Sequence, residues 1–394
     1  MKGLRKFVDN IKPNFVKGGK FEVLESFFDS IETLLFVPNT TTVKGAHIRD
    51  SIDTKRTMIF VFISLMPAFL FGLYNTGLQN ALMLGIETSF VENVFTGLLA
   101  ILPMIIVSYG VGLGLEILFA QLRGHEVSEG FFVTGLLIPM VMPIDIPLWM
   151  VALATAFAVI FGKEVFGGTG MNIFNPALLA RAFAFFAYTP YMSGAEVWVD
   201  GMGKAVKAGE VVDSYTGATA LEQLVNNTPV AERSYSTMDA FLGFIPGSFG
   251  ETSTAAILIG AAILLFTGIG SWRTMLSVFV GGGVMVLVFN TFGGDSVYMQ
   301  TTMCEHFVVG GFAFGAVFMA TDPVTSAQTN VGKYIVGFMT GAIAILIRVI
   351  NPAYPEGMML SILFMNALAP LVDYYVVEAN IARRNKRIKT VKTE

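Results

Sequence analysis

The stretch "EGFFVTG" (residues 129–135) returns in altered form as "EHFVVGG" (residues 305–311). The tripeptide "NPA" occurs at 175–177 and again at 351–353, at the same separation along the chain. Between these matches, Asp145 in "PIDIP" corresponds to Asp322 in "TDP" with one residue of slippage. Matches that recur at a fixed separation indicate an internal repeat. The sequence therefore predicts two related halves.

Composition places both halves in a membrane. The chain has 394 residues, of which 54% are hydrophobic and 14% charged, and its mean hydropathy is +0.66. Soluble domains carry roughly 25% charged residues, and a membrane span needs about 20 mostly apolar ones. The ten predicted spans are 57–75, 93–121, 129–143, 146–162, 175–191, 254–270, 273–292, 304–321, 331–351 and 357–377. We therefore expect an all-α integral membrane protein.

The basic residues predict its orientation. Ten of the 25 Lys and Arg precede Thr57 and six follow Val377. An even number of spans puts both termini on one side, and the positive-inside rule makes that side cytoplasmic. Five spans separate the two copies, so the expected fold is an inverted five-plus-five repeat. The expected divisions are a cytoplasmic segment at 1–56 with an amphipathic helix in "FEVLESFFDSIETLLF", repeats at 57–191 and 254–377, a periplasmic loop at 192–253, and a basic tail at 378–394.

Two polar stretches fall on the cytoplasmic side of this topology. "GGTGMNIFNPALLAR" (167–181) contains Asn172 and Asn175, and "MATDPVTSAQTN" (319–330) contains Asp322. Asn175 before Pro176 is typical of a helix N-cap, and Thr321, Asp322 and Thr325 are also residue types that cap helices, so capping is one interpretation of both stretches. The other is a ligand cradle, because amides donate and accept hydrogen bonds around a heterocycle. Inverted repeats build such sites near their interface.

Two carboxylates lie inside predicted spans. Glu116 follows the glycines of "GVGLGLE" (110–116), and Asp373 lies late in the last span. Ionisable residues in a membrane suggest a proton, sodium or quinone contact, whereas the alternative is a position near the interface that reaches water or a basic partner. The glycines themselves favour close helix packing.

The cofactor choices are narrow. The chain has one cysteine, Cys304, and three histidines, too few for an iron–sulfur cluster held by four thiolates. It lacks the glycine-rich nucleotide motifs. An organic cofactor without metal ligands remains open.

The outer loop contains "DSYTGAT" (213–219). Thr219 precedes "ALEQL" and is expected to cap a helix. Gly217 and Ala218 have little or no side chain, so we also expect that a bulky partner can approach the hydroxyl of Thr219 closely. The two interpretations are compatible.

These stretches resemble a known family. "DSYTGAT" fits the D-x-x-[ST]-G-A-[ST] pattern at which flavin transferases attach FMN through a phosphoester. "GGTGMNIFNPALLARAFAFFAYTP", "EGFFVTGLLIP" and "FMATDPVTSAQT" resemble the B subunits of sodium-translocating NADH:quinone reductases. The resemblance covers nearly the whole chain and extends more weakly to the D subunit of the Rnf complex.

The resemblance implies roles for particular residues. FMN would be attached to Thr219, with Asp213, Thr216, Gly217 and Ala218 completing the motif. A non-covalent riboflavin would contact Asn172, Asn175 and Asp322. Quinone would bind near Gly112 and Glu116, and Asp373 would take part in sodium coupling. The family has two adjacent glycines where this chain has Gly112 followed by leucine.

The function implied is that of a flavoprotein subunit in the bacterial inner membrane. It would pass electrons from FMN through riboflavin to quinone, coupled to Na⁺ translocation. Its partners would be the other subunits of the complex, a flavin transferase, quinone and lipid, with no nucleic acid. The alternatives are an Rnf-type ferredoxin:NAD⁺ subunit and a non-redox solute channel or transporter.

Overall fold

The computed structural model describes residues 2–16, 18–21, 28, 32–33, 36, 42–48, 54–123, 130–209, 211, 215–293, 296, 298–351 and 354–391. Every regular element in these residues is helical. The first half of the chain contains α3 (Thr54–Leu84), α4 (Phe90–Arg123), α5 (Gly130–Met140), α6 (Leu148–Gly162) and α7 (Pro176–Ala187). The second half contains α11 (Thr254–Phe266), α12 (Trp272–Phe292), α13 (Met303–Val308), α14 (Phe312–Phe314), the π-helix η6 (Gly315–Met319), α15 (Asn330–Ile350) and α16 (Met358–Val391).

Shorter helices complete the chain. The N-terminal segment holds α1 (Lys2–Ile11) and the 3₁₀-helix η1 (Lys12–Asn14). The stretch between the halves, expected as a loop, holds α8 (Met202–Ala208), α9 (Ala220–Val225) and α10 (Thr237–Leu242). The remaining 3₁₀-helices are η3 (Glu164–Phe166), η4 (Thr189–Tyr191) and η5 (Val230–Glu232). The amphipathic helix expected in "FEVLESFFDSIETLLF" lies largely outside the described residues.

Within the described residues, six helices are long and apolar enough to cross a membrane: α3, α4, α6 extended by η3, α12, α15 and α16. Three further apolar helices, α5, α7 and α11, have only 11, 12 and 13 residues. At 1.5 Å per residue they are about 16–20 Å long, less than the roughly 30 Å of the hydrocarbon core. The prediction of an all-α membrane protein is confirmed, but these three helices are shorter than the predicted spans.

The predicted span 304–321 is wrong as a continuous helix. The chain leaves α13 at Val309, and Gly310 adopts a positive φ of 68° that a helix interior does not permit. It then re-enters helical structure as α14 and the π-helix. The "VVGG" that marked the repeat is therefore the point at which this helix breaks.

Glycines bring the main helices into close contact. A Cβ added at Gly97 of α4 would lie 1.9 Å from the carbonyl oxygen of Leu73 in α3. A Cβ at Gly281 of α12 would lie 1.9 Å from the carbonyl oxygen of Phe338 in α15. Backbones approach this closely only where small residues allow it. Helix α6 packs on both α4 and α7, α15 packs on both α12 and α16, and α3 joins the halves by packing on α11.

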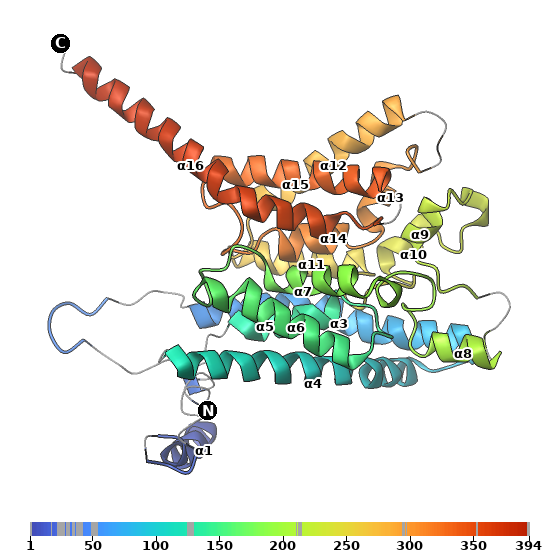
Figure 1. The fold of residues 1–394 in the computed structure, drawn as a ribbon, viewed down its shortest axis with the longest axis horizontal. Helices are drawn as coiled ribbons and strands as arrows, with labels where there is room; N and C mark the ends of the chain where they lie inside the picture. The colour runs from blue at the N-terminus through green and yellow to red at the C-terminus, as the bar shows by residue number, and fades with distance from the viewer. Residues whose placement is uncertain are drawn as a thin grey trace.

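Figure 1 shows where the ends of these helices lie. The first half occupies the lower part of the view and α12, α15 and α16 the upper part. Helix α1 and the free end of α16 lie at the left, and α8, α9 and α10 lie at the opposite side. The short helices between the two halves therefore gather at the side of the molecule away from both termini.

Candidate functional site

Thr219 is the N-cap of α9, as the sequence predicts. Its backbone is extended (φ −66°, ψ 156°), and its Oγ1 accepts a hydrogen bond from the backbone N of Glu222 at 3.2 Å. The Oγ1 of Thr216 accepts one from the backbone N of Ala218 at 3.2 Å. Burial raises the pKa of the Glu222 carboxyl, which lies in this first turn. Asp213 lies outside the described residues.

Gly217 corrects one expectation. It is buried, and a Cβ there would lie 2.3 Å from the carbonyl oxygen of Ala195 and 2.4 Å from Sδ of Met202. The glycine is therefore needed for close packing inside the protein and does not leave the backbone open to the outside. Thr219 is half-buried.

A cavity of about 250 Å³ lies beside Thr219. Its lining combines aromatic side chains with a group of charged ones. The aromatic members are Phe185, Trp198 and Tyr354, and the charged ones are Arg181, Glu222, Glu251 and Glu356. The lining comes from α7, α9, the segment between α7 and α8 that contains Trp198, the segments that precede α11 and α16, and Gly310. A concave site with a few convergent polar groups is typical of a ligand pocket.

Arg181 organises the charged group. Its Nη1 donates to both carboxylate oxygens of Glu251, at 3.0 and 3.1 Å, and its Nη2 donates to Ser248 Oγ at 3.3 Å and to Glu356. The side chain of Arg181 is only 4% exposed. The sequence located Arg181 inside a predicted span but did not name its partners. A charge in an apolar helix indicates that a partner must exist, although not where.

Arg348 of α15 lies behind the cavity wall. It is fully buried, and its Nη1 donates to the carbonyl oxygen of His306 at 2.6 Å. Within the described part of the chain, its Nε and Nη2 make no hydrogen bond. Nη2 lies 3.3 Å from where a Cβ of Gly310 would be, and Gly310 lines the cavity. The guanidinium of Arg348 therefore lies behind Gly310, on the far side of the cavity wall.

Asn175 and Asp322, which lie in the two polar stretches expected on one side of the membrane, are in contact. Asn175 Oδ1 caps α7 by accepting from the backbone N of Ala177 at 3.0 Å and of Leu178 at 3.3 Å. Its Nδ2 donates to Asp322 Oδ2 at 3.3 Å. Thr325 Oγ1 also donates to that oxygen, at 3.0 Å. Asn175 is thus both a helix cap and part of a polar group shared by the two halves.

Two further amides lie near this group. Asn172 is buried and donates from Nδ2 to the carbonyl oxygen of Phe174 at 3.1 Å. The sequence analysis missed Asn366 of α16. With its amide oriented to satisfy its neighbours, the oxygen of Asn366 accepts from the backbone N of Asn175 at 3.3 Å. An amide inside an apolar helix was the available signal.

Glu116 is a buried carboxylate with a basic partner. It forms an ion pair with Lys163, and their side chains are 3% and 6% exposed. Arg123, the nearer basic residue in sequence, pairs with Glu164 at 3.2 Å. A Cβ at Gly112 would lie 1.8 Å from Cζ of Phe131. Gly112 therefore serves close packing of α4 on α5.

Asp373 joins α16 to the start of α15. Its carboxylate accepts from the backbone N of Gln328 at 2.6 Å, and from the backbone N and Oγ1 of Thr329 at 3.1 and 2.5 Å. Thr329 is the N-cap of α15. Asp373 therefore stabilises the N-terminus of α15 by binding its N-cap residue, Thr329. Among the described residues, no group of three or more His, Cys, Asp or Glu side chains is arranged to hold a metal ion.

Comparison with known proteins relates these sites to a family. Residues 41–382 match the model of the NQR2, RnfD, RnfE family. Three proteins, each named as the B subunit of a Na(+)-translocating NADH-quinone reductase, are similar over 98% of this chain. They come from Chromohalobacter salexigens (47% identical, 97% of that protein covered), Azotobacter vinelandii (45%, 99%) and Neisseria meningitidis serogroup B (42%, 99%).

Proposed function

The chain belongs to the NQR2, RnfD, RnfE family, and we propose that it is the B subunit of a Na⁺-translocating NADH-quinone reductase. The observation that carries this proposal is the position of Thr219, whose hydroxyl belongs to the flavin-attachment motif and lies at a cavity lined by Arg181, Glu251 and Glu356. Identity of 42–47% along almost the entire chain supports it. The protein is then a multi-pass membrane component of a redox enzyme, working in the bacterial inner membrane with the other subunits.

The outer flavin is FMN, joined through a phosphoester to Thr219. Asp213, Thr216, Gly217 and Ala218 form the motif that a flavin transferase recognises. The aromatic lining of the cavity suits a planar ring, and Arg348, whose Nε and Nη2 make no hydrogen bond within the described residues, lies behind Gly310 in the cavity wall. When bound, the isoalloxazine ring accepts and passes on electrons, while the protein positions it and sets its electrostatic environment.

The inner flavin is riboflavin, held by Asn172, Asn175 and Asp322. The contact between Asn175 and Asp322 supports this assignment, because it gathers amide and carboxylate groups from both halves. Such groups donate to and accept from a polar heterocycle and its hydroxyls. The cap that Asn175 makes to α7 uses Oδ1 and leaves Nδ2 for the ligand or for Asp322.

Quinone reaches the region of Gly112 and Glu116, and Asp373 takes part in sodium coupling. Both roles carry a structural condition. A quinone at Gly112 must displace the ring of Phe131, and a quinone contact at Glu116 must compete with Lys163. At Asp373, sodium must compete with the donors of Gln328 and Thr329.

The topology we propose is the inverted five-plus-five repeat with both termini in the cytoplasm. Its divisions are those expected from the sequence: 1–56, 57–191, 192–253, 254–377 and 378–394. The matched packing of α6 on α4 and α7, and of α15 on α12 and α16, supports the repeat. The position of α8, α9 and α10 opposite α1 and the end of α16 supports a periplasmic place for Thr219 (Figure 1).

The test is to express the chain with the other subunits and a flavin transferase in cells that lack the enzyme. We expect a fluorescent band that survives SDS gel electrophoresis, and NADH-driven quinone reduction that depends on Na⁺. A colourless chain would favour the solute-channel alternative. Fluorescence together with ferredoxin-dependent NAD⁺ reduction would favour the Rnf-type alternative.

A further inference from the structure

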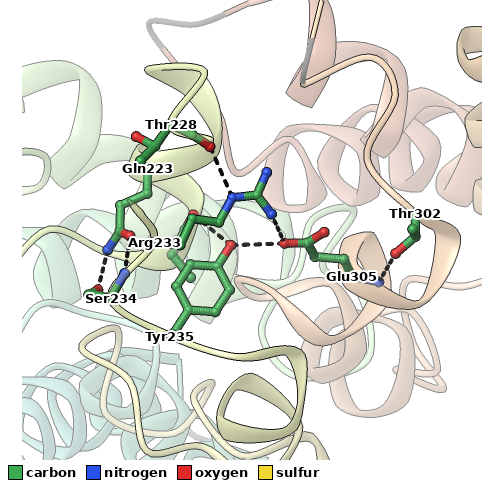
Figure 2. Close-up of polar contacts among 8 residues, drawn as sticks. Gln223, Thr228, Arg233, Ser234, Tyr235, Thr302 and Glu305 are labelled. Carbon is green, nitrogen blue, oxygen red and sulfur yellow. Dashed lines mark hydrogen bonds and ion pairs between the residues drawn. The ribbon is translucent and has the colours of Figure 1, made fainter. Parts of the chain in front are cut away.

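The segment that follows α9, the helix that begins directly after Thr219, is joined to α13 by a buried ion pair (Figure 2). Arg233 Nη1 lies 2.5 Å from Glu305 Oε1, and the two side chains are 4% and 9% exposed. Tyr235 Oη donates to the same carboxylate oxygen at 3.1 Å. Thr302 caps α13 by accepting from the backbone N of Glu305 at 3.3 Å. The Glu305 carboxylate of α13 therefore accepts hydrogen bonds from two residues in the segment that follows α9.

Gln223 ties that segment to the residue before Thr219. Its Nε2 donates to the carbonyl oxygen of Ala218 at 3.2 Å and to Ser234 Oγ at 2.6 Å, and its Oε1 accepts from the backbone N of Ser234 at 3.0 Å. Ser234 is the neighbour of Arg233. The contacts thus run from Ala218 through Gln223 and Ser234 to the ion pair, and Figure 2 shows those from Gln223 onward.

Apolar contacts bring the same helix to the wall of the cavity. Leu221 and Leu224 of α9 pack in one cluster with Val308 and Val309 at the end of α13. A Cβ at Gly310 would lie 3.3 Å from Cδ2 of Leu221. Helix α9 therefore rests on the point where the membrane helix breaks.

Helix α9 has six residues, and so short a helix has little stability of its own in water. Its position must come from these tertiary contacts. We propose that Arg233, Glu305 and Tyr235 form a latch that seats α9 on α13 and so positions the group carried by Thr219 over the cavity. The role of the latch in holding a flavin rests on the proposed function, whereas its role in seating Thr219 does not.

Two measurements on the complete, detergent-purified complex test the latch. The first is quenching of the covalent flavin by iodide, and the second is labelling of Thr219→Cys by a membrane-impermeant maleimide in a Cys304→Ser background, because Cys304 is an exposed thiol. In Arg233→Met we expect both the quenching slope and the labelling rate to rise several-fold. Tyr235→Phe, which retains the ion pair, should raise them less.

The control variants distinguish a change in the position of α9 and Thr219 from a general loosening of the outer segment. Arg233→Lys keeps the charge and should restore both measurements toward the wild-type values. Asp239→Asn weakens the capping box of α10 in the same outer segment without touching the ion pair, and should change neither measurement. Unchanged labelling in both Arg233→Met and Tyr235→Phe, or an equal rise in Asp239→Asn, would overturn the latch. A wild-type chain without covalent flavin would instead refute the proposed function, and the labelling test would still decide on the latch.

Discussion

The proposed outer site at Thr219 and the proposed inner site at Asn175 and Asp322 are assembled in opposite ways. At the outer site, the hydroxyl of Thr219 makes its hydrogen bond within three residues, to Glu222, in a motif that is continuous in sequence. At the inner site, Asn175 meets Asp322 from 147 residues away. The proposed FMN attachment depends on the one hydroxyl oxygen of Thr219, whereas the inner site shares its hydrogen bonds among several groups. A single substitution at Thr219 should therefore abolish flavin attachment completely, whereas a single substitution at the inner site should weaken riboflavin binding by degrees.

The sharpest test of this contrast is Thr219→Val. Valine has nearly the same shape but lacks the oxygen that the phosphoester needs, so we expect complete loss of covalent FMN. The lost cap costs roughly 1 kcal/mol, too little to unfold the protein. In-gel fluorescence and intact mass measure the outcome, with Thr228→Val as a control in the same segment. Fluorescence retained in Thr219→Val would move the attachment site elsewhere.

The largest loss of stability is expected from substitutions in the charged group around Arg181, which lines the cavity beside Thr219. Arg181→Met leaves Glu251 and Glu356 buried without their cation, and removing one partner of a buried ion pair costs about 3–5 kcal/mol. We expect a large drop in the thermal unfolding midpoint of the purified complex. Lys204→Met, which removes an exposed cation from the outer segment, should stay within about 0.5 kcal/mol. Similar midpoints for the two variants would show that the Arg181 group does not support the fold.

The same contrast explains what the sequence could predict. Thr219 as a helix cap and the long apolar helices follow from local pattern. The predicted repeat places the stretches that contain Asn175 and Asp322 on one side, but the hydrogen bond between these two residues comes from the structure. The sequence did not predict that Gly217 is buried against Met202, because that contact depends on how distant segments fold together. For the same reason Lys163, not the nearer Arg123, is the partner of Glu116. Backbone geometry at Gly310 likewise interrupts a helix that hydropathy alone predicts to be continuous.

At the inner site, Asn175→Leu should remove riboflavin selectively. The loss of hydrogen bonds to a buried ligand costs about 1–3 kcal/mol of binding free energy. This cost lowers the affinity roughly five- to 150-fold. Asn175→Ser keeps a good N-cap for α7 but lacks the amide donor, so it should recover stability and not riboflavin. Acid-extracted riboflavin per complex is the measurement, with FMN on Thr219 as the internal standard. Full riboflavin occupancy in both variants would leave Asn175 as a helix cap only.

The smallest expected effect concerns Asp373, where capping and sodium coupling make different predictions. Asp373→Asn removes a charge that favours the N-terminus of α15, and Thr329→Val removes the cap hydroxyl that donates to Asp373. Each should cost roughly 1 kcal/mol of stability. Only the first variant alters a carboxylate able to bind Na⁺. We therefore expect Asp373→Asn alone to raise the Na⁺ concentration needed for half-maximal NADH-driven quinone reduction. An equal Na⁺ requirement in the two variants would remove Asp373 from the coupling, because it would then act only through the cap it forms on Thr329.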